Sequence, residues 1–395
     1  MSGHGVKYMY SDTTRILEMV EDVSSTVIAK NTSDTDKFAR WPEQGIRALQ
    51  AAGLGGLTVP IEYGGLGFGT ETLAKVCETI GRHCASTSIC FGMHCVGSAV
   101  IASKVTDFQQ DNYLTPICEG KHITSLSLSE LGSGSHFYLP QTKMVNTGDG
   151  NYIVEGEKSF ATNGGRADSY VVSAVVNEPG QAIGKFNCVI IPGDSDGLDW
   201  GPNWAGLGLR GNSSRNLSLN KVKVSENQIL GNEGDQIWYI FNVITPYFLT
   251  AIAGAYLGLA RAAIDEVKAH ITNRKYSFNG KTLASSSVIQ HQMGTMWAKY
   301  ARVRALLYWA TQCYDKGIAD NQLDLFSAKA EIAETVIEIV NDGMTFCGGT
   351  AYREESNLYR MLRDARAAHI MSPTTDMLRI WVGRSILDQP LLTDT

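Results

Sequence analysis

The chain of 395 residues contains few cysteines, few prolines and few charged residues. Its 8 cysteines are too sparse for a disulfide scaffold and predict buried free thiols in a reducing compartment. Charged residues make up 19%, and the net charge of −6 is spread without long runs of one sign. This pattern excludes nucleic acid and a charged membrane surface as expected partners and leaves a small molecule. With 44% hydrophobic residues, the chain is not of the disordered class either.

Long uninterrupted apolar segments are also missing. Residues 1–30 carry acidic and basic side chains throughout, which predicts no signal peptide. The most apolar helical stretch, residues 247–260, is shorter than the roughly 20 residues that cross a bilayer. We therefore expect a cytoplasmic protein without a membrane span.

Glycine, in contrast, is abundant. The chain has 40 glycines, and many of them come in pairs beside well-patterned segments, at positions 64–65, 132 and 134, 164–165 and 348–349. Such clusters indicate places where the backbone turns with positive φ or approaches a ligand closely.

Hydrophobic periodicity predicts an α+β protein of three domains, with a helical domain at 1–122, a β-barrel domain at 123–232 and a four-helix bundle at 233–395. The predicted strands are residues 125–129, 151–156, 169–176, 186–191 and 217–224. The predicted bundle helices are residues 235–271, 287–316, 323–343 and 374–387.

Two polar segments follow predicted strands. In residues 127–135 serine and glycine alternate, and their backbone N–H groups and hydroxyls could hold a phosphate or the polar edge of a flavin ring. Residues 155–165 follow a predicted hairpin and place a second strand end beside the first. Taken alone, a serine and glycine segment such as 127–135 is more often a plain connecting loop.

Together these segments resemble the acyl-CoA dehydrogenase family of flavoproteins, over essentially the whole chain. The family signature Thr-Glu-Pro-Gly-Ala-Gly-Ser-Asp is similar to residues 129–136, and Gly-x-Lys-x-Trp-Ile-Thr-Asn is similar to residues 156–163. Residues 59–65, 208–211, 348–349 and 363–366 also match. The resemblance implies a FAD enzyme acting on an acyl thioester of coenzyme A or an acyl carrier protein. It further implies an electron-transfer flavoprotein or O2 as acceptor, and a homodimer or homotetramer.

The resemblance assigns a set of residues to FAD. Ser129 and Thr162 match groups that bond the pyrimidine edge and the N5 region, and Phe160 replaces a tryptophan that lies against the isoalloxazine ring. Ser135 matches a serine near the pyrophosphate and the pantetheine arm of the substrate. The full set is Leu128, Ser129, Gly134, Ser135, Phe160, Thr162, Arg274, Phe278, Thr345, Gly348, Gly349 and Thr374.

Part of this set is expected to bind the pyrophosphate and the adenosine half of FAD. Arg274 matches an arginine that pairs with the pyrophosphate across a subunit interface, since an anionic diphosphate needs a cation. Gly348 and Gly349 match a pair that lets the backbone approach the adenosine half. Thr345 stands where the family has a glutamine.

The sequence departs from the family at the catalytic base. The position of the family glutamate that removes the α-proton of the thioester is Ser372, a poor base near neutral pH. At a second position used by some members the residue is Phe248, and residues 243–261 contain no acid. Asp376, one helical turn beyond Ser372, is a weaker candidate, because an acid at the start of the last helix is more often exposed or capping. His369 is more typical of a structural hydrogen bond.

Three functions remain open from the sequence. The first is α,β-desaturation of an acyl thioester with the usual base replaced by Ser372. The second is a family offshoot that needs no α-proton abstraction, such as a flavin-dependent oxygenase or oxidase or a thioester lyase. The third is a non-catalytic FAD-binding or subunit-interaction protein. We expect one helix to carry His83, Cys84, Cys90, His94 and Cys95, and on it Cys90 and His94 have a spacing that a metal could use. Without a second ligand pair, we expect buried thiols and no metal site.

Overall fold

The computed structural model describes residues 4–176, 186–232, 234–318 and 321–392. The first third is helical, as predicted. Its helices are α1 (His4–Val23), α2 (Ala29–Lys37), α3 (Glu43–Ala51), α4 (Thr70–His83), α5 (Ala85–Ser103), α6 (Asp107–Gln109) and α7 (Thr115–Cys118). The chain turns between α4 and α5 at Cys84, whose backbone is extended. This break corrects the expectation that His83, Cys84, Cys90 and His94 share one helix.

The middle third is one curled sheet of seven strands, in which β1 pairs with β4 and the order continues through β2, β3, β7 and β6. The strands are β1 (Thr124–Ser127), β2 (Lys143–Asn146), β3 (Asn151–Ala161), β4 (Ser169–Val176), β5 (Phe186–Pro192), β6 (Leu198–Trp200) and β7 (Arg215–Ser225). The five predicted strands are present. The sequence did not predict β2 and β6, because strands of four and three residues carry too little alternation to detect.

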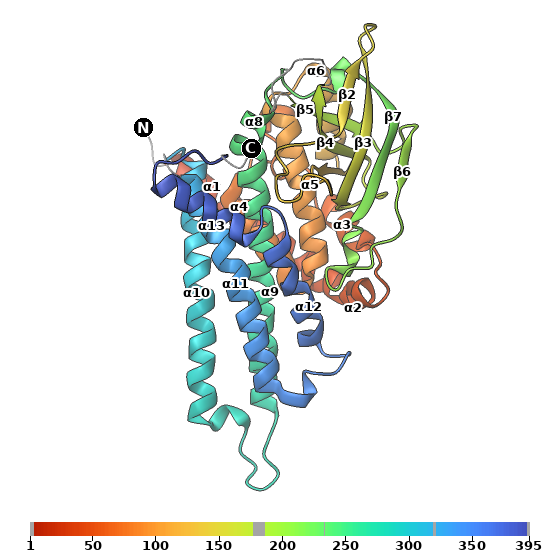
Figure 1. Ribbon diagram of the computed structural model, residues 1–395. Coiled ribbons are helices and arrows are strands. Elements are labelled where there is room, and N and C mark those ends of the chain that lie inside the picture. Colours follow the sequence, from red (N-terminus) through yellow and green to blue (C-terminus); the bar gives the residue numbers. More distant parts are fainter. Residues whose placement is uncertain (1–3, 177–185, 233, 319–320, 393–395) are drawn as a thin grey trace.

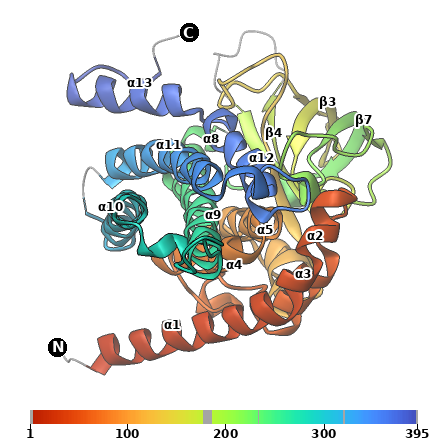
Figure 2. The ribbon, with the colours of Figure 1, turned by 90° about the horizontal axis from the view of Figure 1, so that it is seen from below.

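The last third consists of α8 (Gln236–Tyr239), α9 (Thr245–Asn273), α10 (Ser287–Asp315), α11 (Asn321–Cys347), α12 (Asn357–Ile370) and α13 (Thr375–Ile386). Figure 1 shows α9, α10 and α11 as long rods that extend away from the sheet. Helix α12 was not predicted as a helix. Seen from below, α5 and α12 lie between the sheet and α9, α10 and α11 (Figure 2).

Helix α9 forms the centre of the molecule, because it packs against both α4 and the bundle. A Cβ at Gly254 would lie 2.6 Å from the carbonyl oxygen of Ala74, and one at Gly258 would lie 2.2 Å from that of Glu78. Only glycine therefore allows α4 and α9 to approach this closely. By length and composition, α5 and residues 237–273 could each cross a membrane. This finding corrects the expectation that the most apolar helical stretch, residues 247–260, is too short to do so. However, 100% and 89% of the most apolar windows of these two segments are buried inside the protein.

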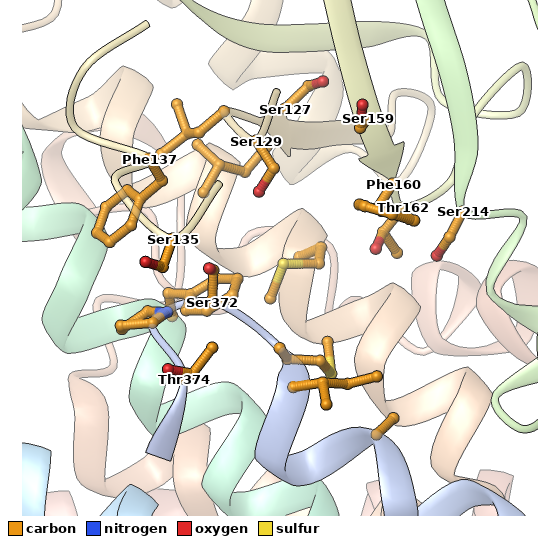
Figure 3. A pocket seen from close by; sticks show the side chains of 18 of the residues that line it. Ser127, Ser129, Ser135, Phe137, Ser159, Phe160, Thr162, Ser214, Ser372 and Thr374 are labelled. Carbon is orange, nitrogen blue, oxygen red and sulfur yellow. The ribbon is translucent and has the colours of Figure 1, made fainter. Parts of the chain in front are cut away.

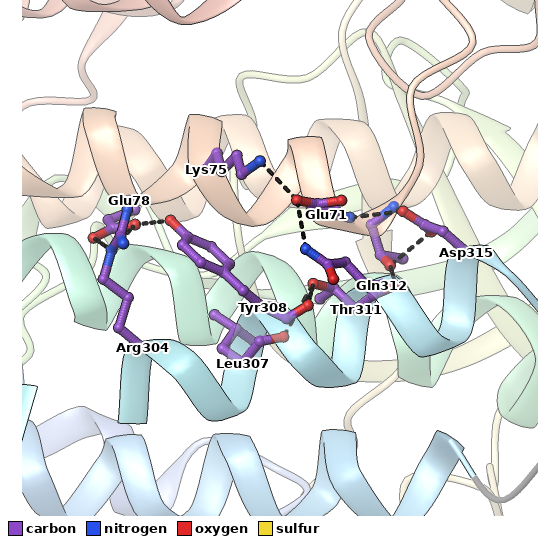
Figure 4. A network of polar contacts seen from close by, with 10 residues as sticks. Glu71, Lys75, Glu78, Arg304, Leu307, Tyr308, Thr311, Gln312 and Asp315 are labelled. Carbon is purple, nitrogen blue, oxygen red and sulfur yellow. Dashed lines mark hydrogen bonds and ion pairs between the residues drawn. The ribbon is translucent and has the colours of Figure 1, made fainter. Parts of the chain in front are cut away.

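Helix α10 is attached to α4 by polar contacts (Figure 4). The carboxylate of Asp315 accepts hydrogen bonds from the backbone N–H groups of Thr70 and Glu71, at 2.8 and 2.9 Å, and so caps the first turn of α4. Further along, Glu78 accepts hydrogen bonds from Tyr308 and Arg304. These contacts hold α4 against the bundle helix α10.

Candidate functional site

A cavity of about 500 Å³ lies where the sheet meets the helices (Figure 3). Its walls come from residues 126–137 after β1, the end of β3, the loop at 204–214, the start of α9 and the connection between α12 and α13. In Figure 3, Ser135, Ser372 and Thr374 lie on one side of the cavity, and Phe160, Thr162 and Ser214 lie on the other. The volume is in the range of pockets that bind a small molecule or cofactor.

The two strand ends predicted from the sequence lie side by side at this cavity. The backbone N–H of Ser159 on β3 donates to the carbonyl oxygen of Ser129 after β1, at 2.8 Å. Phe160 has a φ of 58°, so the strand turns sharply there and its side chain stays 56% exposed at the cavity. Its ring meets Trp204 edge to face, with centroids 6.2 Å apart. This geometry leaves an open aromatic surface beside the Thr162 hydroxyl.

Glu130 carries the one carboxylate on the cavity wall in the described part of the chain, and it is already paired. Its Oε1 lies 2.5 Å from Nζ of the fully buried Lys158, and its Oε2 accepts a hydrogen bond from the N–H of Gln141 at 2.6 Å. Burial alone would raise the pKa of Glu130, but Lys158 and the hydrogen bonds hold it below its usual value. Burial lowers the pKa of Lys158 to about 8, although the Glu130 charge opposes the shift. The pair is therefore charged at neutral pH and acts as a structural tie.

Three buried polar atoms at the cavity have no hydrogen-bond partner among the described residues. They are Ser127 Oγ, Asn212 Oδ1 and Thr245 Oγ1, and each residue is at most 3% exposed. A buried polar atom without a partner costs about 1–3 kcal/mol. The three atoms therefore point to a ligand whose own polar atoms complete these hydrogen bonds. Ser127 belongs to the segment 127–135 that the sequence indicated. The sequence did not indicate Asn212 and Thr245, because they reach the cavity only through tertiary packing.

The structure brings most predicted residues together at the cavity. Its lining includes Leu128, Ser129, Gly134, Ser135, Phe160, Thr162, Ser372 and Thr374. Thr374 also accepts a hydrogen bond from the N–H of Met377 and so caps α13. The second predicted group, Arg274, Phe278, Thr345, Gly348 and Gly349, is exposed and lies outside the cavity. A Cβ at Gly348 or Gly349 would meet no atom within 4 Å, so the backbone there is open to a ligand.

No free base faces the cavity within the described part of the chain. The half-buried Ser372 and the apolar Phe248, which the sequence resemblance aligns with the family glutamates, both line it. Asp376 is exposed on α13 and does not line the cavity. His369 also lies off the lining, and partial burial together with Arg366 lowers its pKa. Apart from the paired Glu130, the described lining residues thus offer hydroxyls, an amide and apolar groups, and no free base.

His94 serves as a structural hydrogen bonder. Its Nε2 lies 2.9 Å from the carbonyl oxygen of Gly55, and its Nδ1 accepts a hydrogen bond from the N–H of Thr124 at 3.2 Å. Burial lowers the pKa of His94 to about 4, so the imidazole is neutral. Across the described residues, no group of three or more histidine, cysteine or acidic side chains could hold a metal ion.

Asp364 on α12 anchors one wall of the cavity. Its Oδ1 accepts a hydrogen bond of 2.6 Å from the N–H of Leu209, whose own φ is 48°. A Cβ at Gly208 would lie 2.3 Å from the carbonyl oxygen of Arg363, so the loop lies directly on α12. Burial raises the pKa of Asp364 to about 6.

This raised pKa predicts the sign of a pH effect. The Asp364 carboxyl binds a proton more tightly in the folded protein than in the unfolded chain, so its ionised form destabilises the fold. This loss of stability is complete above the folded pKa of about 6, and it declines as the pH falls toward the unfolded pKa near 4. Relative to Asp364→Asn, the wild type should gain about 1 kcal/mol in free energy of unfolding between pH 7.5 and pH 5. Urea unfolding of both proteins at the two pH values measures this difference. Parallel pH dependence in the two proteins would show that Asp364 does not titrate in this way.

The fold and the cavity define a class: a flavoprotein in which a sheet domain and helical domains on both sides enclose the flavin site. Residues 11–121, 125–222 and 250–387 match the N-terminal, middle and C-terminal domain models of acyl-CoA dehydrogenase, respectively. The chain belongs to the acyl-CoA dehydrogenase family. It is accordingly an oxidoreductase, and FAD is the cofactor of the family.

Relatives match along their full length. The chain is 28% identical to a cyclohex-1-ene-1-carbonyl-CoA dehydrogenase of Geobacter metallireducens, over 97% of this chain and 100% of the relative. It is 29% identical to a cyclohexane-1-carbonyl-CoA dehydrogenase of the same organism, over 96% and 98% of the two chains. The solved structure of butyryl-CoA dehydrogenase from Megasphaera elsdenii covers 95% of this chain and 98% of its own, with a TM-score of 0.89 at 23% identity. That likeness shows the fold.

The residues present fit FAD. The unpartnered Ser127 Oγ and Asn212 Oδ1 and the hydroxyls at the two strand ends offer hydrogen bonds to the polar edge of a flavin ring, and the apolar wall with Phe160 offers a surface for its rings. Gly134, with a φ of 54° and no atom within 4 Å of a Cβ, leaves room for close approach. Sequence motifs indicated the strand ends, whereas Asn212 and Trp204 follow only from the fold.

Proposed function

We propose that the protein is a FAD-dependent oxidoreductase acting on an acyl thioester of coenzyme A or an acyl carrier protein, with α,β-desaturation as the primary reaction. The observation that carries this proposal is the cavity, in which flavin-binding hydroxyls and an apolar wall face each other. When bound, FAD would supply the acceptor for a hydride from the substrate.

The cavity side chains have separable roles in this proposal. Ser129 and Thr162 bind the flavin, and Ser135 lies at the side expected for the pantetheine arm. Met93 and Phe248 supply apolar surface for the acyl group and exclude water from it. Ser372 can form a hydrogen bond with the thioester, but its hydroxyl does not hold an abstracted proton near neutral pH.

One observation favours a second candidate, a family offshoot whose reaction needs no α-proton abstraction. Among the described residues that line the cavity, the only ionisable side chain is the paired Glu130. Oxidation next to a heteroatom, or reaction of the reduced flavin with O2, would proceed without such a base. A prolyl acyl carrier protein oxidase shares the fold, with a TM-score of 0.86 at 22% identity over 95% of this chain and 99% of its own.

An anaerobic titration tests these proposals. We expect the purified protein to show a flavin absorbance spectrum and to be bleached by saturated acyl-CoA thioesters, with straight, branched and cyclic acyl groups tested in turn. Because Ser372 is a poor base, we expect bleaching to be slow. Bound FAD without bleaching by any thioester would refute desaturation and support the offshoot. A colourless protein that takes up no FAD would refute both and support a non-flavin role.

The exposed second group of predicted residues fits a FAD site shared between two copies of the chain. Arg274 and Phe278 lie in the loop between α9 and α10, at the end of the bundle away from the sheet (Figure 1). We propose that this loop and the open backbone at Gly348 and Gly349 bind the pyrophosphate and adenosine of FAD held by a second copy, in a homodimer or homotetramer. The cation of Arg274 and the open backbone support this assignment. An electron-transfer flavoprotein or O2 would then reoxidise the flavin.

A further inference from the structure

Lys329 on α11 is buried directly behind the wall that carries Ser372. The residue is 1% exposed, and its Nζ donates hydrogen bonds to the carbonyl oxygens of Met371 and Pro373, at 3.2 and 2.9 Å. The two acceptors flank Ser372 on both sides. Lys329 itself does not line the cavity.

The same short segment is held at two further points. The hydroxyl of Tyr256 on α9 lies 3.2 Å from Sδ of Met371. Thr374 caps α13 with its side chain. The connection between α12 and α13 is thus tied to α9, to α11 and to its own following helix. Of these ties, only the one from Lys329 holds the backbone on both sides of Ser372.

Burying a lysine at this position is energetically unfavourable compared with burying an apolar side chain. Within the described residues, Lys329 has no acid within ion-pair distance, so two carbonyl dipoles alone balance its charge. Burial lowers its pKa to about 7, which reflects the unfavourable desolvation of the ammonium group. A methionine would fill the same space without this penalty. The feature that the lysine adds is the pair of directed hydrogen bonds.

We propose that Lys329 is a positioning residue, whose two hydrogen bonds fix the turn from Met371 to Pro373 and thereby set how far Ser372 reaches toward the substrate. The proposal rests on the proposed function for the nature of that substrate, an acyl thioester. The effect of Lys329 on the depth and shape of the cavity does not depend on which reaction the protein catalyses. Lys329 touches neither substrate nor flavin in this role.

The test compares Lys329→Met, Lys329→Gln and the control Lys299→Met in the full-length protein with FAD. Lys299 is the matched control because it also joins two bundle helices, through ion pairs with Glu338 and Asp342, but lies away from the cavity. Two quantities are measured. Hydrogen exchange followed by mass spectrometry reports on peptides covering residues 369–377. The flavin absorbance change reports the dissociation constant of a short thioether analogue of acyl-CoA that cannot be oxidised.

For Lys329→Met we expect exchange in these peptides to become at least about tenfold faster, with α9 and α10 unchanged, because the turn loses the donor of both hydrogen bonds. The dissociation constant of the analogue should rise by at least about tenfold at unchanged FAD content. Lys329→Gln keeps a donor and should fall between Met and wild type. If Lys329→Met does not fold, the measurements on Lys329→Gln alone test the positioning role. Lys299→Met should match the wild type in both measurements.

Wild-type exchange at the turn in Lys329→Met or Lys329→Gln would overturn the positioning role. Faster exchange throughout the bundle would overturn it too, since that indicates general destabilisation. If the wild type binds no acyl-CoA analogue, the proposed function fails instead. The exchange rates at the turn still decide the inference in that case.

Discussion

Ser372→Glu is expected to speed the anaerobic bleaching of the flavin by a saturated acyl-CoA by at least about 100-fold. A positioned carboxylate that accepts the α-proton contributes about 10²–10⁴-fold to such a step. Ser372 already lines the cavity, so the new carboxylate would face the substrate rather than solvent. Stopped-flow absorbance under anaerobic conditions measures the rate directly.

Ser372→Gln is the matched control for this gain. Glutamine has the size of glutamate but cannot hold the proton, so it separates base chemistry from the filling of space. The glutamate variant should lose its gain as the pH falls and the carboxylate is protonated, whereas the glutamine variant should show no such profile. Equal rates in the two variants would show that position 372 does not face the α-carbon of the substrate.

The helices and the longer strands could be predicted from the sequence because each has a clear period. Strand β4 (Ser169–Val176) has the predicted bounds, and the helix predicted at 287–316 corresponds to α10. Helix α12 escaped prediction because its 14 residues include three arginines and are recognised more readily as a polar motif. The break at Cys84 escaped because the apolar residues continue across it. The hydrophobic pattern of the sequence does not reveal a change of direction between two consecutive buried helices.

The site could be predicted only where residues are close along the chain. The segments at 127–135 and 155–165 indicated the two strand ends, which do meet at Ser129 and Ser159. Thr245 and Asn212 gave no such signal, since single hydroxyl and amide groups occur in many surface loops. Lys329 also gave no signal in the sequence, because a lysine within a helix is most often exposed to solvent. Its burial depends on α13 covering α11, which is a property of the tertiary fold.

The charge state of the cavity also follows from tertiary structure alone. From the sequence, Glu130 lies in the flavin-edge loop and could be considered a free acid. In the fold Lys158, which is 28 residues away along the chain, neutralises it and leaves the lining without an available base. The absence of a base at Ser372 is therefore not compensated from the neighbouring loop. The described lining residues therefore supply no free carboxylate beside Ser372.

Lys158→Met is expected to cause the largest loss of stability, about 3–5 kcal/mol in free energy of unfolding. The change leaves the Glu130 carboxylate buried without its cation and removes the hydrogen bonds from Nζ to Ser173. It should also reduce FAD content, because Glu130 holds the loop that forms one cavity wall. Urea unfolding and the ratio of flavin to protein absorbance measure the two effects.

The double variant Glu130→Gln/Lys158→Met separates the unpaired charge from lost packing. Gln can still accept a hydrogen bond from the N–H of Thr142 but carries no charge, so the double variant should be more stable than Lys158→Met alone. The loss in Lys158→Met should also be smaller at pH 5 than at pH 8. Without Lys158 the pKa of the buried Glu130 rises, and protonation at the lower pH removes the unpaired charge. A loss that is equal at both pH values and in both variants would mean that packing of the lysine stem, rather than the ion pair, holds this wall in place.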